Sequence, residues 1–233
     1  VTVNGQTYRC AQSRAHGEVN LRAALAQSCN CYFIELGQKL GAQRLIKAAQ
    51  DFGLGQSITL ASGLQSDAAS LPSAAQLQNA GDLALFSFGQ GALTATPLQI
   101  AAMTNVIADG GVYRTPAAVQ GVRRADGSII PNEVPAPRRV CSAATAKILR
   151  SMLHTVVEQG IGSDAMTGAG ECAGKTGTAQ TGQFDADGRE LLNYWFTGFY
   201  PADAPRYTIT VLQDARQAPE NSSAAVFADV VQG

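Results

Sequence analysis

Apolar residues recur at helical spacing through the first two thirds of the chain. One predicted helix begins near Asn20 and runs into Ser28 and Asn30, and a second spans residues 42–52. Because residues three and four apart share one face of a helix, these stretches predict helices with a buried stripe. The apolar residues that form the two stripes are Leu21, Ala24, Leu25, Leu45, Ile46, Ala49 and Phe52. The first part of the chain is therefore predicted to be mainly helical.

Two further helices carry clear start signals. Residues 96–99, Thr-Pro-Leu-Gln, combine a capping box with proline in the first helical position, and they predict a helix from Pro97 to about Asp109. Another helix is predicted between Ser142 and Gly160. Its one-sided apolar residues are Ile148, Leu149, Met152, Leu153, Val156 and Val157. Only short apolar runs, such as residues 111–122, indicate strands in this region.

The pattern changes after residue 160, where glycine-rich loops and β-prone runs replace helical periodicity. Turn-forming residues at 185–188 and 201–205 separate three predicted strands, and Ser222 or Ser223 caps a closing helix that runs to about Val231. The three strands are Glu171–Thr181, Leu191–Tyr200 and Arg206–Asp214. This order predicts a single α+β domain over residues 1–233, with a mainly helical lobe at 1–160 and antiparallel strands and a C-terminal helix at 161–233.

Charge and composition narrow the classes of function. The chain has 17 basic and 18 acidic residues, for a net charge of -1, and its basic residues are scattered. Such a pattern lacks the basic surface that tracks a phosphate backbone, so no nucleic-acid partner is predicted. A hydrophobic fraction of 45% is ordinary for a folded globular protein. No stretch reaches the ~18 consecutive apolar residues that a membrane span needs.

Cys10, His16, Cys29 and Cys31 raise the question of a metal site. The chain has five cysteines in all, an odd number that does not fit a small disulfide framework. Zinc prefers cysteine and histidine ligands, but the spacings of these four residues match none of the usual paired-ligand patterns. The alternative is four ordinary residues near one helix, with or without one disulfide. The sequence spacing therefore predicts no bound metal.

The tripeptide Gly-Lys-Thr at residues 174–176 resembles the end of a phosphate-binding P-loop. The full pattern, G-x-x-x-x-G-K-[ST], requires glycine at the position of Ala169. A P-loop also needs a buried strand before it and a helix that begins at its lysine. Residues 163–170 are loop-like, and the glycine and threonines of residues 177–181 favour an extended strand. The sequence therefore disfavours a nucleotide site.

On a strand, the tetrapeptide Lys175-Thr176-Gly177-Thr178 makes chemical sense as an anion site. Alternation places Lys175 and Gly177 on one face and the two threonines on the other. A lysine ammonium is a point charge for a carboxylate, and glycine lets a ligand backbone approach. The amide of Thr178 can supply half of an oxyanion hole, and an outer strand can bind a peptide by strand addition. The alternative is a surface lysine on an ordinary strand.

Together with this tetrapeptide, several motifs resemble the penicillin-binding proteins, especially the class B transpeptidases. Ser28-Cys29-Asn30 resembles the Ser-x-Asn element of that family, and residues 175–177 resemble its Lys-Thr-Gly element. The stretches that resemble family sequence are residues 16–25, 28–33, 89–91, 96–101, 175–180 and 195–201. They cover nearly the whole chain and agree in order and spacing, which makes the resemblance specific.

The resemblance implies a β-lactamase/transpeptidase-like fold with an active site between the helical lobe and the sheet. It further implies action on the D-Ala-D-Ala end of peptidoglycan stem peptides, acylation by β-lactam antibiotics, and no cofactor. The implied catalytic residues are Ser28 as a proton relay, Asn30 as a hydrogen-bonding partner of the substrate amide, and Lys175 as the charge over the terminal carboxylate. The implied substrate-binding residues are Thr176, Gly177 and Thr178.

The Ser-x-x-Lys element of the family is not found. No serine in the chain has a lysine three positions later, although acyl transfer in the family uses that serine as its nucleophile. Two explanations are open: the chain is a fragment of a working enzyme, or it is a homologue that lost its nucleophile and now binds or scaffolds. A start without Met or a signal pattern favours the fragment, as do the intact cleft motifs. The chain alone is therefore predicted to be inactive.

The fragment interpretation carries further expectations. The parent enzyme is expected at the extracytoplasmic face of the bacterial membrane, anchored by a segment absent here. Loss of the upstream segment would expose apolar surface and a strand edge, so the chain is expected to self-associate. A carboxypeptidase, a β-lactamase or a β-lactam sensor uses the same constellation of residues. The stretches at 96–101 and 195–201 favour a class B transpeptidase among these.

Overall fold

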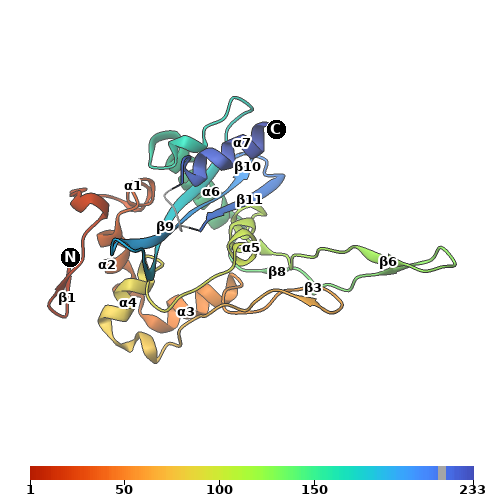
Figure 1. Cartoon of the computed structure of the whole chain (residues 1–233), viewed down its shortest axis with the longest axis horizontal. Coiled ribbons are helices and arrows are strands. Elements are labelled where there is room, and N and C mark those ends of the chain that lie inside the picture. The colour runs from red at the N-terminus through yellow and green to blue at the C-terminus, as the bar shows by residue number, and fades with distance from the viewer. Residues whose placement is uncertain (215–218) are drawn as a thin grey trace.

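The computed structural model describes residues 1–214 and 219–233 of the chain. Helices and a three-stranded antiparallel sheet form the predicted α+β arrangement (Figure 1). The strands are β9 (Ala173–Phe184), β10 (Glu190–Tyr200) and β11 (Tyr207–Gln213), in the spatial order β11-β10-β9. The three predicted strands are confirmed to within three residues at each end. Within the described part of the chain, β9 is an outer strand of the sheet.

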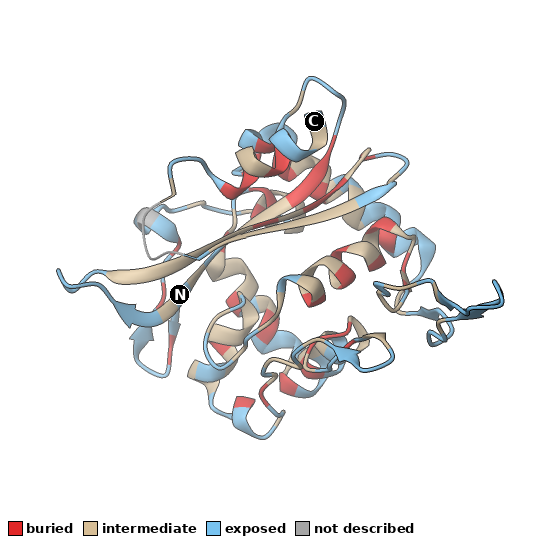
Figure 2. Ribbon diagram, turned by 45° about the vertical axis from the view of Figure 1, so that its right-hand side comes forward, coloured by how far each residue is buried: buried red, intermediate tan, exposed pale blue. Residues whose placement is uncertain are grey.

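Both faces of the central strand β10 are covered. Phe196 is fully buried, and its ring centroid lies 4.8 Å from that of Phe227 on α7 (Ser223–Gln232). Phe199 points to the opposite face, as the two-residue period of a strand requires, and packs with Ala108 of α5 (Pro97–Ala108). Figure 2 shows the sheet between α7 and the helical part of the chain. The sheet therefore has one face toward α7 and one toward the helical lobe.

The capped helices form where their start signals predict. The hydroxyl of Thr96 accepts a hydrogen bond from the Gln99 amide at 3.1 Å, while the Gln99 side chain accepts one from the Thr96 amide at 2.9 Å. This reciprocal pair is the predicted capping box of α5. Ser142 caps α6 (Ala143–Gln159) by accepting from the amide of Thr145 at 3.0 Å. The helix α3 (Ala42–Asp51) and the closing helix α7 are also confirmed.

Two helices were not predicted, namely α2 (Asn30–Leu40) and α4 (Ala80–Ser87). Gly37 lies inside α2, and glycine weakens a helical pattern because of its conformational freedom. A Cβ atom at Gly37 would lie 1.9 Å from the Oγ of Ser87. The glycine therefore permits the close contact of α2 with α4, which compensates for its low helix propensity.

The structure corrects the prediction that one helix continues from Asn20 into the Ser28-Cys29-Asn30 motif. The helix α1 (Leu21–Ala26) ends earlier, and Ser28 has a φ of 51°. This left-handed conformation is incompatible with a continuing right-handed helix. Asn30 is instead the first residue of α2. The motif therefore forms the junction of two helices.

The remaining elements are short. Within the run at 111–122, where a strand was indicated, the chain forms β5 and the first residues of β6. An extended arm that carries the β6–β7 hairpin projects from the body of the molecule (Figure 1). None of the helices among the described residues combines the length and apolar character needed to cross a membrane. The short elements are β1 (Thr2–Val3), β2 (Gln6–Thr7), β3 (Thr59–Ala61), β4 (Leu64–Gln65), β5 (Val112–Tyr113), β6 (Gly121–Arg123), β7 (Ile129–Pro131), β8 (Arg138–Arg139), η1 (Ala11–Ser13), η2 (Gln76–Gln78) and η3 (Ser163–Ala165).

Candidate active site

Five separate segments of the chain meet around one cleft beside β9. The cleft encloses about 850 Å³, and we call it the β9 cleft. Its walls come from η1 and the loop after it, from the α1–α2 junction, from the loop after α4, from the end of α6, and from the first half of β9. The predicted site residues all line this cleft: Ser28, Asn30, Lys175, Thr176, Gly177 and Thr178. Residues 147 positions apart in the sequence are therefore brought together.

Lys175 connects the two sides of the β9 cleft. Its Nζ donates a hydrogen bond to the Oγ of Ser28 at 3.1 Å, across from the sheet to the α1–α2 junction. The same ammonium group contacts the carbonyl oxygen of Thr176 at 3.1 Å and its hydroxyl at 3.4 Å. Burial lowers the pKa of Lys175 from its ordinary 10.5 to about 8, because a desolvated ammonium is less stable. The hydrogen bonds thus hold the lysine in place, but they do not fully compensate the desolvation of its ammonium group.

The side chain of Asn30 is also held at the cleft. Its amide nitrogen donates to the backbone carbonyl of Arg9 at 3.2 Å. This contact ties the first residue of α2 to the segment that precedes η1. The carboxamide oxygen has two lone pairs and can accept a hydrogen bond from an incoming amide. Asn30 is therefore placed to contact a ligand that lies between α2 and β9.

The two glycines of the β9 motif differ in what surrounds them. A Cβ at Gly174 would lie 2.5 Å from the ring of Phe196 and 2.6 Å from the carbonyl oxygen of Thr197, so this glycine is required by packing. At Gly177 the nearest atom would be the Cβ of Trp195 at 3.4 Å, an ordinary contact. The fold therefore does not require glycine at position 177. Its place in the cleft wall fits close approach of a ligand instead.

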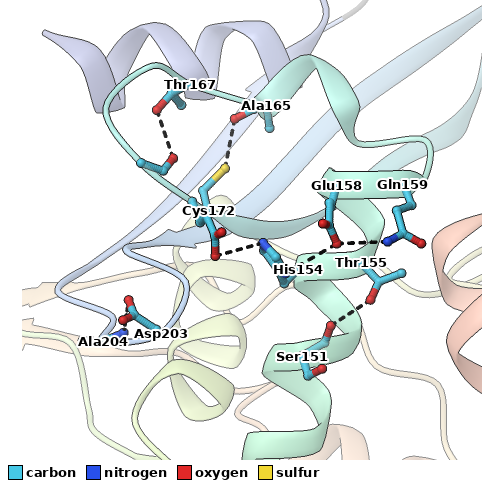
Figure 3. Close-up of polar contacts among 12 residues, drawn as sticks. Ser151, His154, Thr155, Glu158, Gln159, Ala165, Thr167, Cys172, Asp203 and Ala204 are labelled. Atoms are coloured by element: carbon cyan, nitrogen blue, oxygen red, sulfur yellow. Dashed lines mark hydrogen bonds and ion pairs between the residues drawn. The ribbon is translucent and has the colours of Figure 1, made fainter.

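The segment that leads into β9 is anchored next to α6 (Figure 3). The thiol of Cys172 donates to the carbonyl oxygen of Ala165 at 2.9 Å, and burial raises the pKa of this thiol to about 11. It therefore stays protonated at neutral pH and is not a nucleophile. Beside Cys172, the Nε2 of His154 on α6 lies 3.4 Å from the carboxylate of Glu171. These contacts fix the start of the strand that carries Lys175.

The charged residues around the β9 cleft favour an anionic ligand. The cations that line it are Arg14 and Lys175, and no aspartate or glutamate lines it among the described residues. Such a one-sided charge distribution raises the local concentration of anions. Of these two cations, only Lys175 belongs to a sequence motif. Arg14 lies in a loop next to η1, and no periodicity or spacing connects it with β9.

Gln90 is a second residue of the cleft that the sequence did not assign a role. Its Nε2 donates to the carbonyl oxygen of Thr178 at 3.1 Å, so the loop after α4 is attached to β9. The flanking Gly89 and Gly91 have φ values of 82° and 81°, which glycine adopts without strain. The Gly-Gln-Gly sequence is one of the stretches that resemble family sequence, but the resemblance gave this glutamine no role. Its tight turn projects the glutamine toward the strand.

The geometry excludes the P-loop interpretation. Lys175 lies in the 12-residue strand β9, and no helix begins at this lysine. The converging amides of a helix N-terminus, which hold phosphates in a P-loop, are therefore absent at this motif. What the cleft offers is one largely buried ammonium, the hydroxyls of Ser28 and Thr176, and Thr178 in its lining. This set can bind a carboxylate and can pass a proton between Ser28 and Lys175.

The lowered pKa of Lys175 predicts a pH-dependent affinity for carboxylates. The ammonium form attracts a carboxylate, so the affinity should be constant well below pH 8 and fall as the pH rises through about 8. The affinity of the chain for acetyl-D-Ala-D-Ala, measured by NMR titration over a pH series that brackets this value, checks the prediction. An affinity that does not change across the series would show that Lys175 does not hold the ligand.

Protein stability should have the opposite pH dependence. Between pH 8 and the ordinary lysine value of 10.5 the unfolded chain binds more protons than the folded chain at this position. The free energy of unfolding should therefore rise with pH over this window, because the buried group is then neutral. Chemical denaturation of the chain and of a Lys175→Met variant isolates this contribution. The variant should lose that part of the rise.

Comparison with known proteins gives a match over almost the full length. A family model for the penicillin binding protein transpeptidase domain matches residues 2–232. Stage V sporulation protein D of Bacillus subtilis is 32% identical, over 98% of this chain and 35% of that protein. The peptidoglycan D,D-transpeptidase MrdA of Haemophilus influenzae is 29% identical, over 88% of this chain and 34% of that protein. The chain thus spans about a third of the length of these curated relatives.

A solved structure agrees with the fold. Penicillin binding protein 3 of Mycobacterium tuberculosis, in complex with aztreonam, superposes with a TM-score of 0.85 and 30% identity. The match covers 98% of this chain and 53% of that protein. The α+β fold is therefore the transpeptidase fold that the motifs implied. By sequence and by structure, the chain belongs to the penicillin-binding protein transpeptidase domain family.

Proposed function

We propose that this chain is part of a class B, serine-type peptidoglycan D,D-transpeptidase, an enzyme that cross-links stem peptides ending in D-Ala-D-Ala. The observation that carries the proposal is the contact between Lys175 and Ser28, 3.1 Å across a cleft. Among the residues that the structure describes, no carboxylate lines this cleft. The cleft is open along an outer strand, and such a strand can bind an extended peptide by strand addition. Membership of the transpeptidase family supports the same activity.

The proposal gives a role to five residues of the β9 cleft. The ammonium of Lys175 attracts the terminal carboxylate of the peptide, and the hydroxyls of Thr176 and Thr178 contact it. The Thr178 amide stabilises the oxyanion of the tetrahedral intermediate. Ser28 relays a proton to the leaving amine, which is consistent with the lowered pKa of the lysine it contacts. Asn30 accepts a hydrogen bond from the substrate amide.

The nucleophilic serine comes from outside residues 1–233 in this proposal. No serine of the chain has a lysine three positions later. Exposed side chains beside the outer strand β11 support this part of the proposal. Tyr207 at the start of β11 is 61% exposed, and Val230 on the neighbouring helix α7 is 57% exposed. A further segment that packs along β11 would cover these side chains. The 233-residue chain alone then binds ligands without forming an acyl-enzyme, and its exposed edge favours self-association.

Two further features follow from the proposed activity. β-Lactams mimic the D-Ala-D-Ala end and should acylate the complete enzyme; the complex of the M. tuberculosis relative with aztreonam supports this. Stem peptides are cross-linked outside the cytoplasmic membrane, so the complete protein acts at the extracytoplasmic face. The division of the chain into a helical lobe at 1–160 and a sheet part at 161–233 is also part of the proposal.

Labelling with fluorescent penicillin tests the proposed function. The full-length product of the gene should form a covalent adduct that disappears when the serine of its Ser-x-x-Lys element is replaced, and the 233-residue chain should form none. A full-length product that is never labelled would contradict the proposed enzymatic function and indicate a binding or scaffold module. An adduct on the 233-residue chain, mapped to Ser28 by mass spectrometry, would contradict the external nucleophile.

A further inference from the structure

Two hydrogen bonds, among the described residues, join the helical lobe to the cleft half of β9. One is the contact of Lys175 with Ser28. The other runs from the Nε2 of Gln90 to the carbonyl oxygen of Thr178 at 3.1 Å, between residues 88 positions apart in the sequence. In the proposed reaction the first contact has a role and the second has none. Gln90 is therefore a polar side chain of the β9 cleft whose purpose is open.

The bond to Gln90 reveals the direction in which Thr178 presents its backbone. In an antiparallel pair of strands, residues alternate between those that exchange both backbone bonds with the partner strand and those that exchange none. The carbonyl oxygens of Thr176 and Thr178, two residues apart, both accept hydrogen bonds from side chains. They therefore point away from β10, toward the outer edge of β9. Because the N–H and C=O of one residue share a direction, the Thr178 amide also faces this outer edge.

Gln90 is held at its backbone as well as at its side chain. Its own amide donates to the carbonyl oxygen of Leu85 at 2.9 Å, in the last turn of α4. The neighbouring amide of Gly89 donates to the carbonyl oxygen of Phe86 at 3.1 Å. The helix α4 packs in turn against α2, which begins at Asn30. A side chain carried on such a fixed turn can hold the edge of β9 in one place relative to the helical wall.

We propose that Gln90 is a positioning residue for the oxyanion donor of the transpeptidase reaction. By binding the carbonyl oxygen of Thr178, it holds the amide of the same residue in one direction toward the cleft. A donor that is aligned before charge develops stabilises an oxyanion without the cost of reorganisation. The outer edge of β9 has no neighbouring strand among the described residues, so a side chain has to supply this alignment. The role rests on the proposed function, because the oxyanion forms only during acyl transfer.

The substitution Gln90→Met tests the proposal in the full-length enzyme, because methionine has a similar length and no donor. The rate of acylation by fluorescent penicillin should fall by ~10–100-fold, since a small misplacement of a reacting group can cost ~100-fold. The affinity for penicillin before acylation should stay within about 2-fold, because the alignment acts on the transition state alone. The dependence of the labelling rate on penicillin concentration separates these two quantities.

The matched control is Gln78→Met, which removes an exposed glutamine from η2 and should change neither quantity. A Gln90→Met enzyme that is acylated at the normal rate, or that loses rate and affinity together, would overturn the positioning role. An unmodified enzyme that is never labelled would instead contradict the proposed function. The two failures are therefore distinguishable.

The substitution Gln90→Glu adds a pH profile that a merely structural role would not produce. The ionised carboxylate has no donor, whereas its protonated form donates an O–H to the carbonyl oxygen of Thr178. The acylation rate relative to the unmodified enzyme at the same pH should therefore recover as the pH falls through the pKa of the new carboxyl group, ordinarily about 4.3. The relative rate of Gln90→Met should not change with pH. A relative rate for Gln90→Glu that stays equally flat would overturn the donor role.

One measurement requires no variant to fold. In the isotope-labelled 233-residue chain, NMR should detect a scalar coupling across the hydrogen bond between the Nε2 of Gln90 and the carbonyl carbon of Thr178. Its side-chain amide protons should also exchange more slowly with solvent than those of the exposed Gln78. Absence of the coupling, with exchange as fast as that of Gln78, would overturn the proposal without reference to catalysis.

Discussion

Replacement of Lys175 by methionine should lower the rate of acylation of the full-length enzyme by fluorescent penicillin by ~10²–10³-fold, the usual cost of removing one preorganised electrostatic contact. The same change should leave the folded chain as stable or more stable at neutral pH. Burial already disfavours the ammonium, as its lowered pKa indicates. Methionine carries no charge, so its burial lacks this desolvation cost.

The opposite signs of these two effects make the Lys175→Met test decisive. Labelling kinetics measure the first effect and chemical denaturation of the 233-residue chain measures the second. Lys147→Met, which removes an exposed lysine from α6, is the control and should change neither quantity. A Lys175→Met variant that labels normally, or that loses activity only because it unfolds, would assign the lysine a structural role.

The paired substitutions Gly177→Ala and Gly174→Ala should separate ligand binding from folding. Alanine at 177 meets only an ordinary contact with Trp195, so the free energy of unfolding should be nearly unchanged, while the added methyl group in the cleft wall weakens ligand binding. Alanine at 174 collides with Phe196 and with backbone, and overpacking of this kind costs about 1–3 kcal/mol.

Thermal unfolding and the affinity for acetyl-D-Ala-D-Ala should be measured for both glycine variants. The expected pattern is a stable Gly177→Ala chain with at least ~10-fold weaker binding, the equivalent of one charge-assisted hydrogen bond, and a destabilised Gly174→Ala chain. If Gly177→Ala binds as tightly as the unmodified chain, no ligand backbone approaches that position. The predicted ligand-binding role of Gly177 would then be wrong.

Local signals predicted the parts of the fold that local chemistry determines. The capping box at Thr96 and the cap at Ser142 place the starts of α5 and α6, and alternation predicts the three strands. In contrast, α2 contains Gly37, whose presence is explained only by the contact with Ser87 of α4. Such tertiary compensation cannot be derived from helix propensity. The turn at Ser28 depends likewise on a left-handed residue that no periodicity indicates.

The candidate site shows the same division between local and tertiary information. Family motifs led to Ser28, Asn30 and Lys175, and the structure brings all three to one cleft. Arg14 and Gln90 reach that cleft from loops, and although Gln90 lies in a stretch that resembles family sequence, only the folded chain shows that both side chains line the cleft. The roles of the site residues and the self-association of the chain stay predictions.

Binding of a D-Ala-D-Ala peptide to the β9 cleft is the measurement that addresses the central claim most directly. The isotope-labelled 233-residue chain is titrated with acetyl-D-Ala-D-Ala and, separately, with the same dipeptide as its C-terminal amide. NMR shifts for the free acid should cluster at Ser28, Asn30 and residues 175–178, and the neutral amide should bind at least ~10-fold more weakly because it lacks the charge that Lys175 attracts. Equal binding of both forms, or shifts confined to other parts of the chain, would contradict a carboxylate site on β9.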